Sequence, residues 1–172
     1  MARPADAIRD YTTADRTAVE ACFRELQEWE QAIDPDRVPA GTIVEAYLDW
    51  LHQQCREKTG KIYVAEVGGR VVGFLCVWLE ATLAGMLSRV RQVAYISDVV
   101  VSAPYRRRGL GTALLARAET YALSVGASCV VVGVLAGNRR AWDVYRHAGF
   151  VEYDLRLLKP LPPPAEPRPA DG

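Results

Sequence analysis

Residues 104–112 (PYRRRGLGT) have the composition of an anion-binding turn. Gly109 and Gly111 are separated by one residue, and glycine permits both a tight turn and close approach of the backbone to a ligand. A helical pattern follows at once, so N–H groups at the positive end of a helix can face an anion. The arginines at 106–108 supply guanidinium groups that suit phosphate oxygens. The segment predicts a pyrophosphate cradle, and a solvated basic turn before a helix is the alternative interpretation.

The composition describes an ordinary globular chain without a strong overall charge. Its 172 residues suffice for one domain with a hydrophobic core and are too few for two domains of usual size. Lys+Arg and Asp+Glu both number 21, so no global field attracts nucleic acid or a membrane surface. We therefore expect neither as a partner, and an anion site must depend on local charge.

The cysteines and histidines predict neither a metal site nor thiol chemistry. The four cysteines are widely spaced without a C-x-x-C pair, which indicates free thiols. A thiol nucleophile would need a histidine partner, and the chain has two histidines, His52 and His147. The N-terminus lacks the apolar core of a signal peptide, and no run reaches the roughly 18 apolar residues of a membrane span. We expect a cytoplasmic protein.

The hydrophobic periodicity predicts alternating strands and helices after a helical N-terminal part. A capping box at Thr12–Asp15 marks the start of the first helix, and Gly68-Gly69 predicts a hairpin turn. Residues 80–92 are less regular and predict a loop. The expected elements are a strand at 8–11, helices at about 15–33 and 41–60, strands at 61–67, 70–79 and 93–102, a helix at 110–125, a strand at 128–135, a helix at 138–147 and a last strand at 150–158.

This order predicts an α/β (α+β) fold with a central mixed, twisted sheet of about six to seven strands and helices on both faces. It is not the Rossmann order, and a third glycine of a G-x-G-x-x-G motif is missing after Gly111. We expect one domain over residues 1–159. Residues 160–172 are rich in proline and predict a disordered tail.

Residues 96–150 resemble the GCN5-related N-acetyltransferase (GNAT) family. The family signature is Arg or Gln, two residues, Gly, one residue, then Gly or Ala, and residues 106–111 (RRRGLG) meet each fixed position. Residues 97–105 (SDVVVSAPY) are similar to the family's central strand. Residues 138–150 (NRRAWDVYRHAGF) are similar to its Asn…Ala…Tyr…Gly-Phe helix. The resemblance implies the acyl-CoA N-acyltransferase fold for the whole domain.

By this resemblance the ligand is acetyl-CoA as co-substrate, with no metal. Its pyrophosphate would meet the N–H groups of residues 106–112, and its pantetheine arm would lie along residues 99–101 as an added strand does. A β-bulge near residues 98–100 would splay the central strand from its neighbour and free an N–H for the developing oxyanion. The residues expected at the cofactor are Val99, Val100, Val101, Arg106, Arg107, Arg108, Gly109, Leu110, Gly111, Thr112, Asn138 and Tyr145.

Asp98 is the candidate base. An amine acceptor resembles lysine, with a pKa of about 10.4, and must lose a proton before it attacks a thioester. A carboxylate within an apolar strand has a raised pKa, which suits this role through one or two waters. A structural carboxylate, or one that orients the ammonium group, is the alternative. Glu66, Glu80 and Glu152 on neighbouring strands are substitutes.

Tyr145 is the candidate acid. The CoA thiol resembles cysteine, with a pKa of about 8.5, and a phenol can protonate the leaving thiolate or hold it by a hydrogen bond. The family's tyrosine lies at the matching position, and a core aromatic is the alternative interpretation. Asn138 can contact the pantetheine, serve as the N-cap of its helix, or do both.

The sequence thus predicts direct acetyl transfer from acetyl-CoA to an amine in a ternary complex. A small-molecule amine is the expected acceptor, and residues 28–42 and 80–92 would decide its identity. A protein N-terminal or lysine acetyltransferase and a non-catalytic acyl-CoA-binding regulatory module are the alternatives. Dimerisation is common in the family, so a homodimer is compatible with the resemblance.

Overall fold

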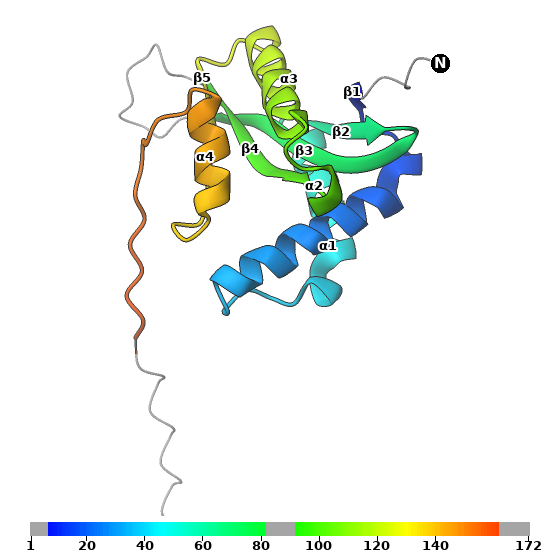
Figure 1. The fold of residues 1–172 in the computed structure, drawn as a ribbon. Helices are drawn as coiled ribbons and strands as arrows, with labels where there is room; N and C mark the ends of the chain where they lie inside the picture. The colour runs from blue at the N-terminus through cyan, green and yellow to red at the C-terminus, as the bar shows by residue number, and fades with distance from the viewer. Residues whose placement is uncertain (1–6, 82–91, 162–172) are drawn as a thin grey trace, which may run out of the picture.

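A computed structural model describes residues 7–81 and 92–161. These residues form a five-stranded sheet in the order β1-β2-β3-β4-β5, flanked by helices (Figure 1). In chain order the elements are β1 (Ala7–Asp10), the 3-10 helix η1 (Thr13–Asp15), α1 (Arg16–Ile33), α2 (Ala40–Glu57), β2 (Lys61–Val67), β3 (Arg70–Ala81), β4 (Gln92–Val101), the 3-10 helix η2 (Ala103–Tyr105), α3 (Leu110–Ser124), β5 (Cys129–Val132) and α4 (Arg139–His147).

The sheet is antiparallel except at one end. β1 to β4 pair as consecutive antiparallel neighbours, and β4 and β5 are parallel because α3 crosses between them. Gly68 and Gly69 both have positive φ and form the predicted two-residue turn between β2 and β3. Mixed α/β architecture with helices on both faces is therefore confirmed.

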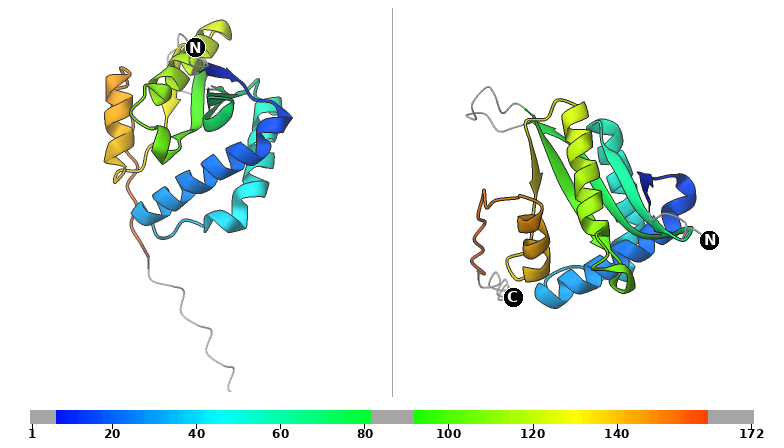
Figure 2. Two further views of the ribbon diagram at one scale, coloured as in Figure 1. Left: turned by 45° about the vertical axis from the view of Figure 1, so that its right-hand side comes forward. Right: turned by 45° about the horizontal axis from the view of Figure 1, so that its top comes forward.

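The two faces of the sheet carry separate hydrophobic cores. Alternate residues of β3 point to opposite faces, so Phe74 and Trp78 pack under α1 and α2 while Leu75 packs under α3. Figures 1 and 2 show this arrangement, with α1 and α2 on one side of the sheet and α3 on the other. Within the described ranges, no helix combines the length and apolar character that a membrane crossing requires.

β4 contains a β-bulge at Ser97. Cys76 of β3 pairs with Asp98, whereas the next residue of β3 pairs with Ile96, so Ser97 is the extra residue. The bulge reverses the alternation of side chains: Ile96 belongs to the core under α3, and Val100 belongs to the core under α1 and α2. Asp98 therefore shares a face with its neighbour Cys76, toward α2. The bulge lies just before the predicted position at residues 98–100.

β4 and β5 diverge after the bulge. Their pairing joins Val93–Ile96 to Cys129–Val132 and then stops. Beyond it, β4 continues to Val101, while β5 ends at Val132, before the end predicted at residue 135. A bulge bends its strand and increases the local twist, which explains why the parallel pair is short. The predicted splay of the central strand is thus present in the backbone.

The predicted last strand at 150–158 is wrong, because residues 150–161 contain neither helix nor strand. The described sheet accordingly has five strands rather than six to seven. Glu80 and Ala81, predicted to begin a loop, belong to β3. Residues 82–91 of that loop and residues 162–172 of the predicted tail lie outside the described residues.

Candidate active site

The divergence of β4 and β5 opens a cleft of about 270 Å³. Its walls come from α1, the second half of β4, the turn before α3, the start of α3, and α4. Of the residues predicted at the cofactor, Arg108 does not line the cleft, and the others do: Val99, Val100, Val101, Arg106, Arg107, Gly109, Leu110, Gly111, Thr112, Asn138 and Tyr145. Segments far apart in the sequence thus meet around one space.

The first turn of α3 presents backbone N–H groups to this cleft. The helix begins with a hydrogen bond from the Ala113 N–H to the Gly109 carbonyl, at 2.9 Å, so the N–H groups of residues 110–112 precede the helical ladder. Gly109, the N-cap, has φ 81° and provides no side-chain cap, which leaves these donors accessible. Arg107 also has positive φ, at 60°. The arrangement can hold an anion.

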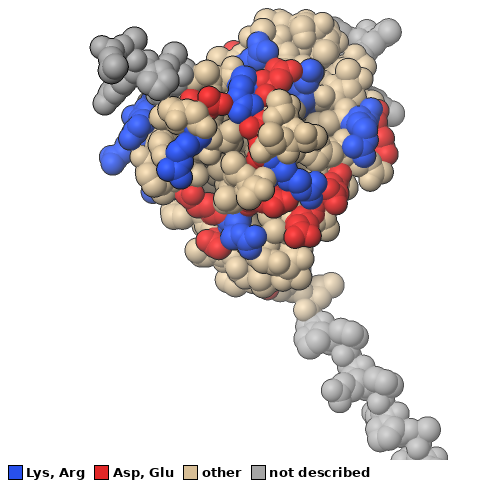
Figure 3. All heavy atoms as spheres, turned by 90° about the vertical axis from the view of Figure 1, so that its right-hand side faces the viewer, with Lys and Arg blue, Asp and Glu red and all other residues tan. Residues whose placement is uncertain are grey.

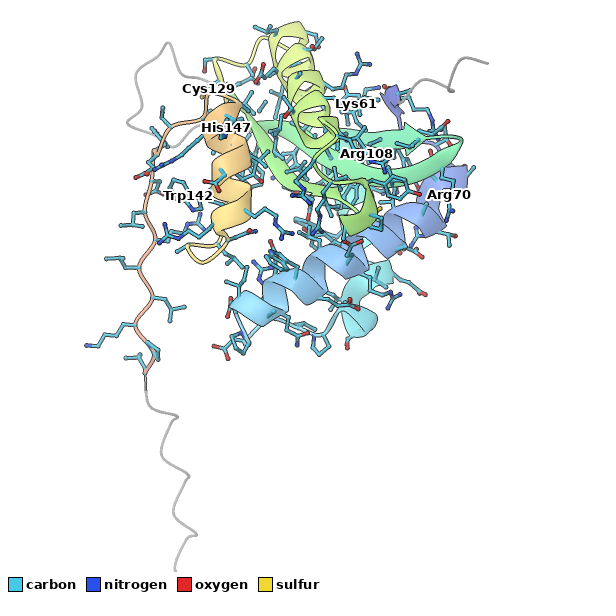
Figure 4. The ribbon with its side chains drawn as sticks, in the orientation of Figure 1. Lys61, Arg70, Arg108, Cys129, Trp142 and His147 are labelled. Carbon is cyan, nitrogen blue, oxygen red and sulfur yellow. The ribbon has the colours of Figure 1, made fainter. Side chains whose placement is uncertain are left out.

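The three arginines of the turn have different surroundings. Arg106 donates from Nε to the Val101 carbonyl at 2.7 Å and from Nη2 to Glu25 at 2.8 Å, so its side chain fastens the turn to β4 and α1. The Arg108 guanidinium lies over the Tyr105 ring, 5.3 Å from its centroid, and Figure 4 shows its place beside the start of α3. Arg107 lines the cleft and makes no hydrogen bond or ion pair with another described residue.

Arg107 is therefore the arginine whose guanidinium is available to an anion in the cleft. The sequence motif alone does not reveal which of the three guanidinium groups is free to bind an anion in the cleft. The ion pair with Glu25, 81 positions away, is what distinguishes Arg106.

Asp98 lies behind the cleft wall, on the α2 side of the bulge, with 7% of its surface exposed. The Tyr47 hydroxyl donates to its carboxylate, 3.0 Å from Oδ2 and 3.2 Å from Oδ1. Burial raises the pKa of Asp98 to about 6, although hydrogen bonds from Ser97 and Tyr47 oppose the rise. The structure therefore contains a buried carboxylate that titrates close to neutral pH.

The carboxylates named as substitutes for Asp98 are engaged elsewhere. Glu66 accepts from Arg9 Nε at 2.8 Å, and Glu80 accepts from Lys58 and from Trp78. Glu152 pairs with Arg146 at 2.8 Å on the exposed surface. None of the three lines the cleft.

Glu30 of α1 is a further carboxylate with an influence on the site. It is half-buried and pairs with Arg37 at 2.7 Å, and burial raises its pKa. Its charge contributes to the raised pKa values of Asp98 and Tyr145. Glu30 is not among the residues predicted for the site from the sequence.

Tyr145 lines the cleft from α4, and its ring packs against Phe150 at 5.7 Å. Burial raises the pKa of its phenol, and the charge of Asp98 raises it further. Asn138 caps α4, because its Oδ1 accepts from the Ala141 N–H at 3.2 Å, and it also accepts from Trp29 Nε1 at 3.4 Å. The charge of the buried Asp98 carboxylate thus acts on the Tyr145 phenol.

Sequence reasoning missed several side chains of the site. Tyr47 is not among the residues predicted for the site, although a buried tyrosine hydroxyl normally has a hydrogen-bond partner. Leu26 and Trp29 bring α1 to the cleft, and Arg140 packs over the Trp29 ring at 4.8 Å. No spacing in the sequence indicates that α1 packs near α4, so these contacts could not be predicted from the sequence.

Comparison with known proteins agrees with this geometry. A family model described as the acetyltransferase (GNAT) family matches residues 23–150. The uncharacterised N-acetyltransferase MJ1207 of Methanocaldococcus jannaschii is 34% identical over 121 residues, which cover 66% of this chain and 50% of that protein. The chain thus spans half the length of that relative.

Solved structures share the fold. A tetramutant of the BH1408 protein from Bacillus halodurans superposes with a TM-score of 0.77 at 21% identity, over 90% of this chain and 99% of that one. A predicted acetyltransferase from Clostridium acetobutylicum, solved with acetyl-CoA, gives a TM-score of 0.69 at 15% identity, over 91% and 96% of the two chains. The chain belongs to the acetyltransferase (GNAT) family, a family of acetyl-CoA-dependent acyltransferases.

Proposed function

We propose that the protein transfers the acetyl group of acetyl-CoA directly to an amine in a ternary complex. One observation carries the proposal: the uncapped N-terminus of α3, the splayed part of β4 and the phenol of Tyr145 line the same cleft. The helix N-terminus suits a pyrophosphate, and the splayed strand suits the amides of a pantetheine arm. The phenol suits a sulfur leaving group.

Acetyl-CoA would bind along these three features in order. The N–H groups of residues 110–112 and the guanidinium of Arg107 would hold its pyrophosphate. The pantetheine amides would pair with β4 over residues 99–101, where β5 no longer does. Arg108 would contact a phosphate only by leaving the Tyr105 ring, so we now assign it a smaller part than Arg107.

Asp98 and Tyr145 can serve as the proton acceptor and the proton donor of the chemical step. The amine nitrogen attacks the thioester carbon, the C–S bond breaks, and the amine proton passes to Asp98 through water, because Asp98 is not in the cleft lining. A pKa near 6 leaves the carboxylate ionised at neutral pH and able to accept that proton. The raised pKa of Tyr145 keeps its phenol protonated, so its O–H can donate to the departing thiolate.

A small-molecule amine is the proposed acceptor. Asp98 is buried under α2 and Glu30 is half-buried on α1, so neither carboxylate lies on an open groove, and their negative charge favours a small cationic amine. A protein N-terminal or lysine acetyltransferase is the second candidate within the same chemistry. A non-catalytic acyl-CoA-binding regulatory module is the candidate outside it.

A thiol-release assay with acetyl-CoA and a panel of small amines and peptides tests the proposal. We expect release of CoA with acetylation of a small amine, identified by mass spectrometry. Turnover with peptides and not with small amines would show that the acceptor is a protein amino group. CoA binding without turnover of any acceptor would favour the regulatory module. An acetylated enzyme that can be isolated would contradict direct transfer.

A further inference from the structure

Two cysteines that lie 21 positions apart in the sequence meet between α2 and the sheet. Cys55 Sγ is 3.5 Å from Cys76 Sγ, and both residues are free thiols. Cys55 belongs to the last turn of α2, whereas Cys76 lies in the middle of β3 and is fully buried. Disulfide-bonded sulfurs lie about 2.0 Å apart, so a shift of about 1.5 Å would join this pair.

The surrounding backbone holds both thiols in place. The Gly60 N–H donates to the Cys55 carbonyl at 2.6 Å, and a Cβ at residue 60 would lie 2.9 Å from the Cys55 sulfur, closer than a real contact allows. Glycine therefore lets the chain pass against the end of α2. Cys76 is fixed from the other side, because it pairs with Ile62 of β2 and with Asp98 of β4. The contact between the thiols is thus a product of tertiary packing.

A second cleft, of about 130 Å³, gives access to Cys55. Its walls come from the end of α2, the end of β1 and the start of β2, and among the described residues it shares no lining residue with the first cleft. Figure 4 shows Lys61, which lines the second cleft, well apart from Trp142 of α4. Cys55 is half-buried and lines this cleft, whereas Cys76 does not. A small reagent can therefore reach Cys55 first.

The two thiols also differ in acidity. The hydrogen bond from Cys76 lowers the pKa of Cys55 against the opposing effect of its partial burial, and the charge of Arg56 lowers this pKa further. Burial raises the pKa of Cys76 well above its usual range, and the neighbouring Cys55 raises it further. Cys55 therefore ionises first while Cys76 keeps its proton. Because the thiolate is the nucleophile in thiol chemistry, Cys55 is the attacking sulfur of the pair.

We propose that Cys55 is an oxidation site for hydroperoxides and that Cys76 converts the oxidised form to a disulfide. The Cys55 thiolate attacks a peroxide oxygen, the O–O bond breaks, and a sulfenic acid forms. The departing hydroxide or alkoxide takes up the proton that Cys55 released. The Cys76 sulfur then attacks the Cys55 sulfur, the S–O bond breaks, and water leaves with the Cys76 proton. The two thiols lose two electrons in all, and the peroxide gains them.

The disulfide would join α2 covalently to the sheet beside the contact between Tyr47 and Asp98. Tyr47 lies on the same helix as Cys55, and Asp98 is the partner of Cys76 in the pairing of β3 with β4. Closing a loop of this length removes conformational freedom from the unfolded chain, so the thermal unfolding midpoint should rise by about 5 to 10 °C. This oxidation is independent of the proposed acetyl transfer.

Oxidation of the Cys129→Ser variant tests the pair, because this change removes the exposed thiol. Hydrogen peroxide should consume two of the remaining thiols, counted in denaturant with a chromogenic reagent, and dithiothreitol should restore both. Peptide mapping by mass spectrometry should find Cys55 linked to Cys76 within one chain. Cys22→Ser in the same background is the matched control. Cys22 is a buried thiol that contacts Ser102 at 3.6 Å, and its replacement should leave the link intact.

Replacement of each partner separates the two steps. In Cys76→Ala the sulfenic acid at Cys55 should persist and be trapped by dimedone, whereas Cys55→Ser should give no disulfide and leave Cys76 unlabelled. Circular dichroism checks that both variants fold, and the peptide map of the unsubstituted protein decides the question without them. Peroxide-treated protein without the link between Cys55 and Cys76, or dimedone labelling of Cys22 as fast as that of Cys55, would overturn the proposal.

Discussion

Asp98 is buried, and among the described residues no lysine, arginine or histidine forms an ion pair with it. Its carboxylate is stabilised by the Tyr47 phenol, a neutral donor. Desolvation therefore dominates, and the pKa rises to about 6 instead of falling as it does for a salt-bridged aspartate. The charged form of Asp98 costs folding free energy, which a purely structural carboxylate would avoid.

This cost predicts a pH-dependent effect of Asp98→Asn on stability. The folded-state pKa is above the usual 3.8, so the native state binds the extra proton between these two values, and rising pH through that range destabilises the wild type. Relative to the variant, the wild type should lose on the order of 3 kcal/mol of unfolding free energy between about pH 4 and about pH 8. Urea titrations at several pH values measure this difference.

Tyr47→Phe provides the second arm of the same experiment. The phenol favours the charged carboxylate, so its removal should raise the Asp98 pKa further and extend the loss of stability to higher pH. Identical pH profiles for the wild type, Tyr47→Phe and Asp98→Asn would show that Asp98 does not titrate in this range.

Tyr145→Phe should lower kcat about 100-fold, because the thiolate loses its hydrogen-bond donor. Affinity for CoA, measured by calorimetry, should remain nearly unchanged, since the ring keeps its contact with Phe150. Tyr63→Phe is the matched control: this buried tyrosine lies on β2 under the Arg117 guanidinium and does not line the cleft. A kcat for Tyr145→Phe equal to that of the control would remove the acid role.

The residues of the site that could be predicted from the sequence lie in contiguous motifs. Residues 106–112 can be identified as an anion cradle because a single turn and the helix that follows determine their arrangement, independently of the rest of the fold. The contact of Tyr47 with Asp98 joins positions 51 apart, and that of Arg106 with Glu25 joins positions 81 apart. Such partners depend on tertiary packing, which single-sequence patterns do not encode.

At the scale of elements, the bulge in β4 explains how one strand both positions Asp98 and lines the cleft. Its extra residue, Ser97, turns Asp98 toward α2 while Val99 and Val101 continue along the face that carries α3. The same distortion ends the pairing with β5 and opens the cleft. The family resemblance predicts that β4 contains a bulge. The exact position of the bulge follows from the register between β3 and β4, which the sequence does not reveal.

The start of α3 gives a prediction that separates folding from ligand binding. Gly111 does not have positive φ, and an added Cβ would lie 4.0 Å from Val144, so Gly111→Ala should fold normally and gain about 0.4 to 1 kcal/mol of stability. If phosphate groups approach this backbone, the methyl group should weaken CoA binding about 10-fold or more. Calorimetry with CoA and thermal unfolding measure the two effects.

Gly41→Ala is the control for this element, because Gly41 lies in the first turn of α2 and does not line the cleft. It should leave CoA affinity unchanged. Gly109 is unsuitable as a test, since its φ of 81° would strain any other residue and confuse folding with binding. Unchanged CoA affinity in Gly111→Ala would place the pyrophosphate elsewhere.

At residues 150–158 the predicted secondary structure and the observed structure differ. Apolar and charged side chains alternate over residues 151–157, which predicts a strand, but a strand also requires a neighbouring edge with which to pair. Within one chain, Gly149 and the ion pair of Arg146 with Glu152 direct the segment away from β5.

At the scale of the whole molecule, positive and negative charges are balanced and intermixed. In Figure 3 basic and acidic side chains are interspersed over the visible face, as the equal totals of 21 and 21 imply. Attraction of a polyanionic ligand therefore depends on the few groups at the start of α3 rather than on long-range steering.

The attachment of α4 to the rest of the molecule gives the last prediction. None of its residues is fully buried, and it faces the start of α3 across the cleft, while Arg140 packs over Trp29 of α1. A ligand that fills the cleft would contact α4 and the sheet together, so CoA should slow amide hydrogen exchange over residues 139–147. Pantetheine, which lacks the pyrophosphate, should protect β4 and α4 without the start of α3. The buried side of α2 is the internal control, and protection spread evenly over the chain would contradict this arrangement.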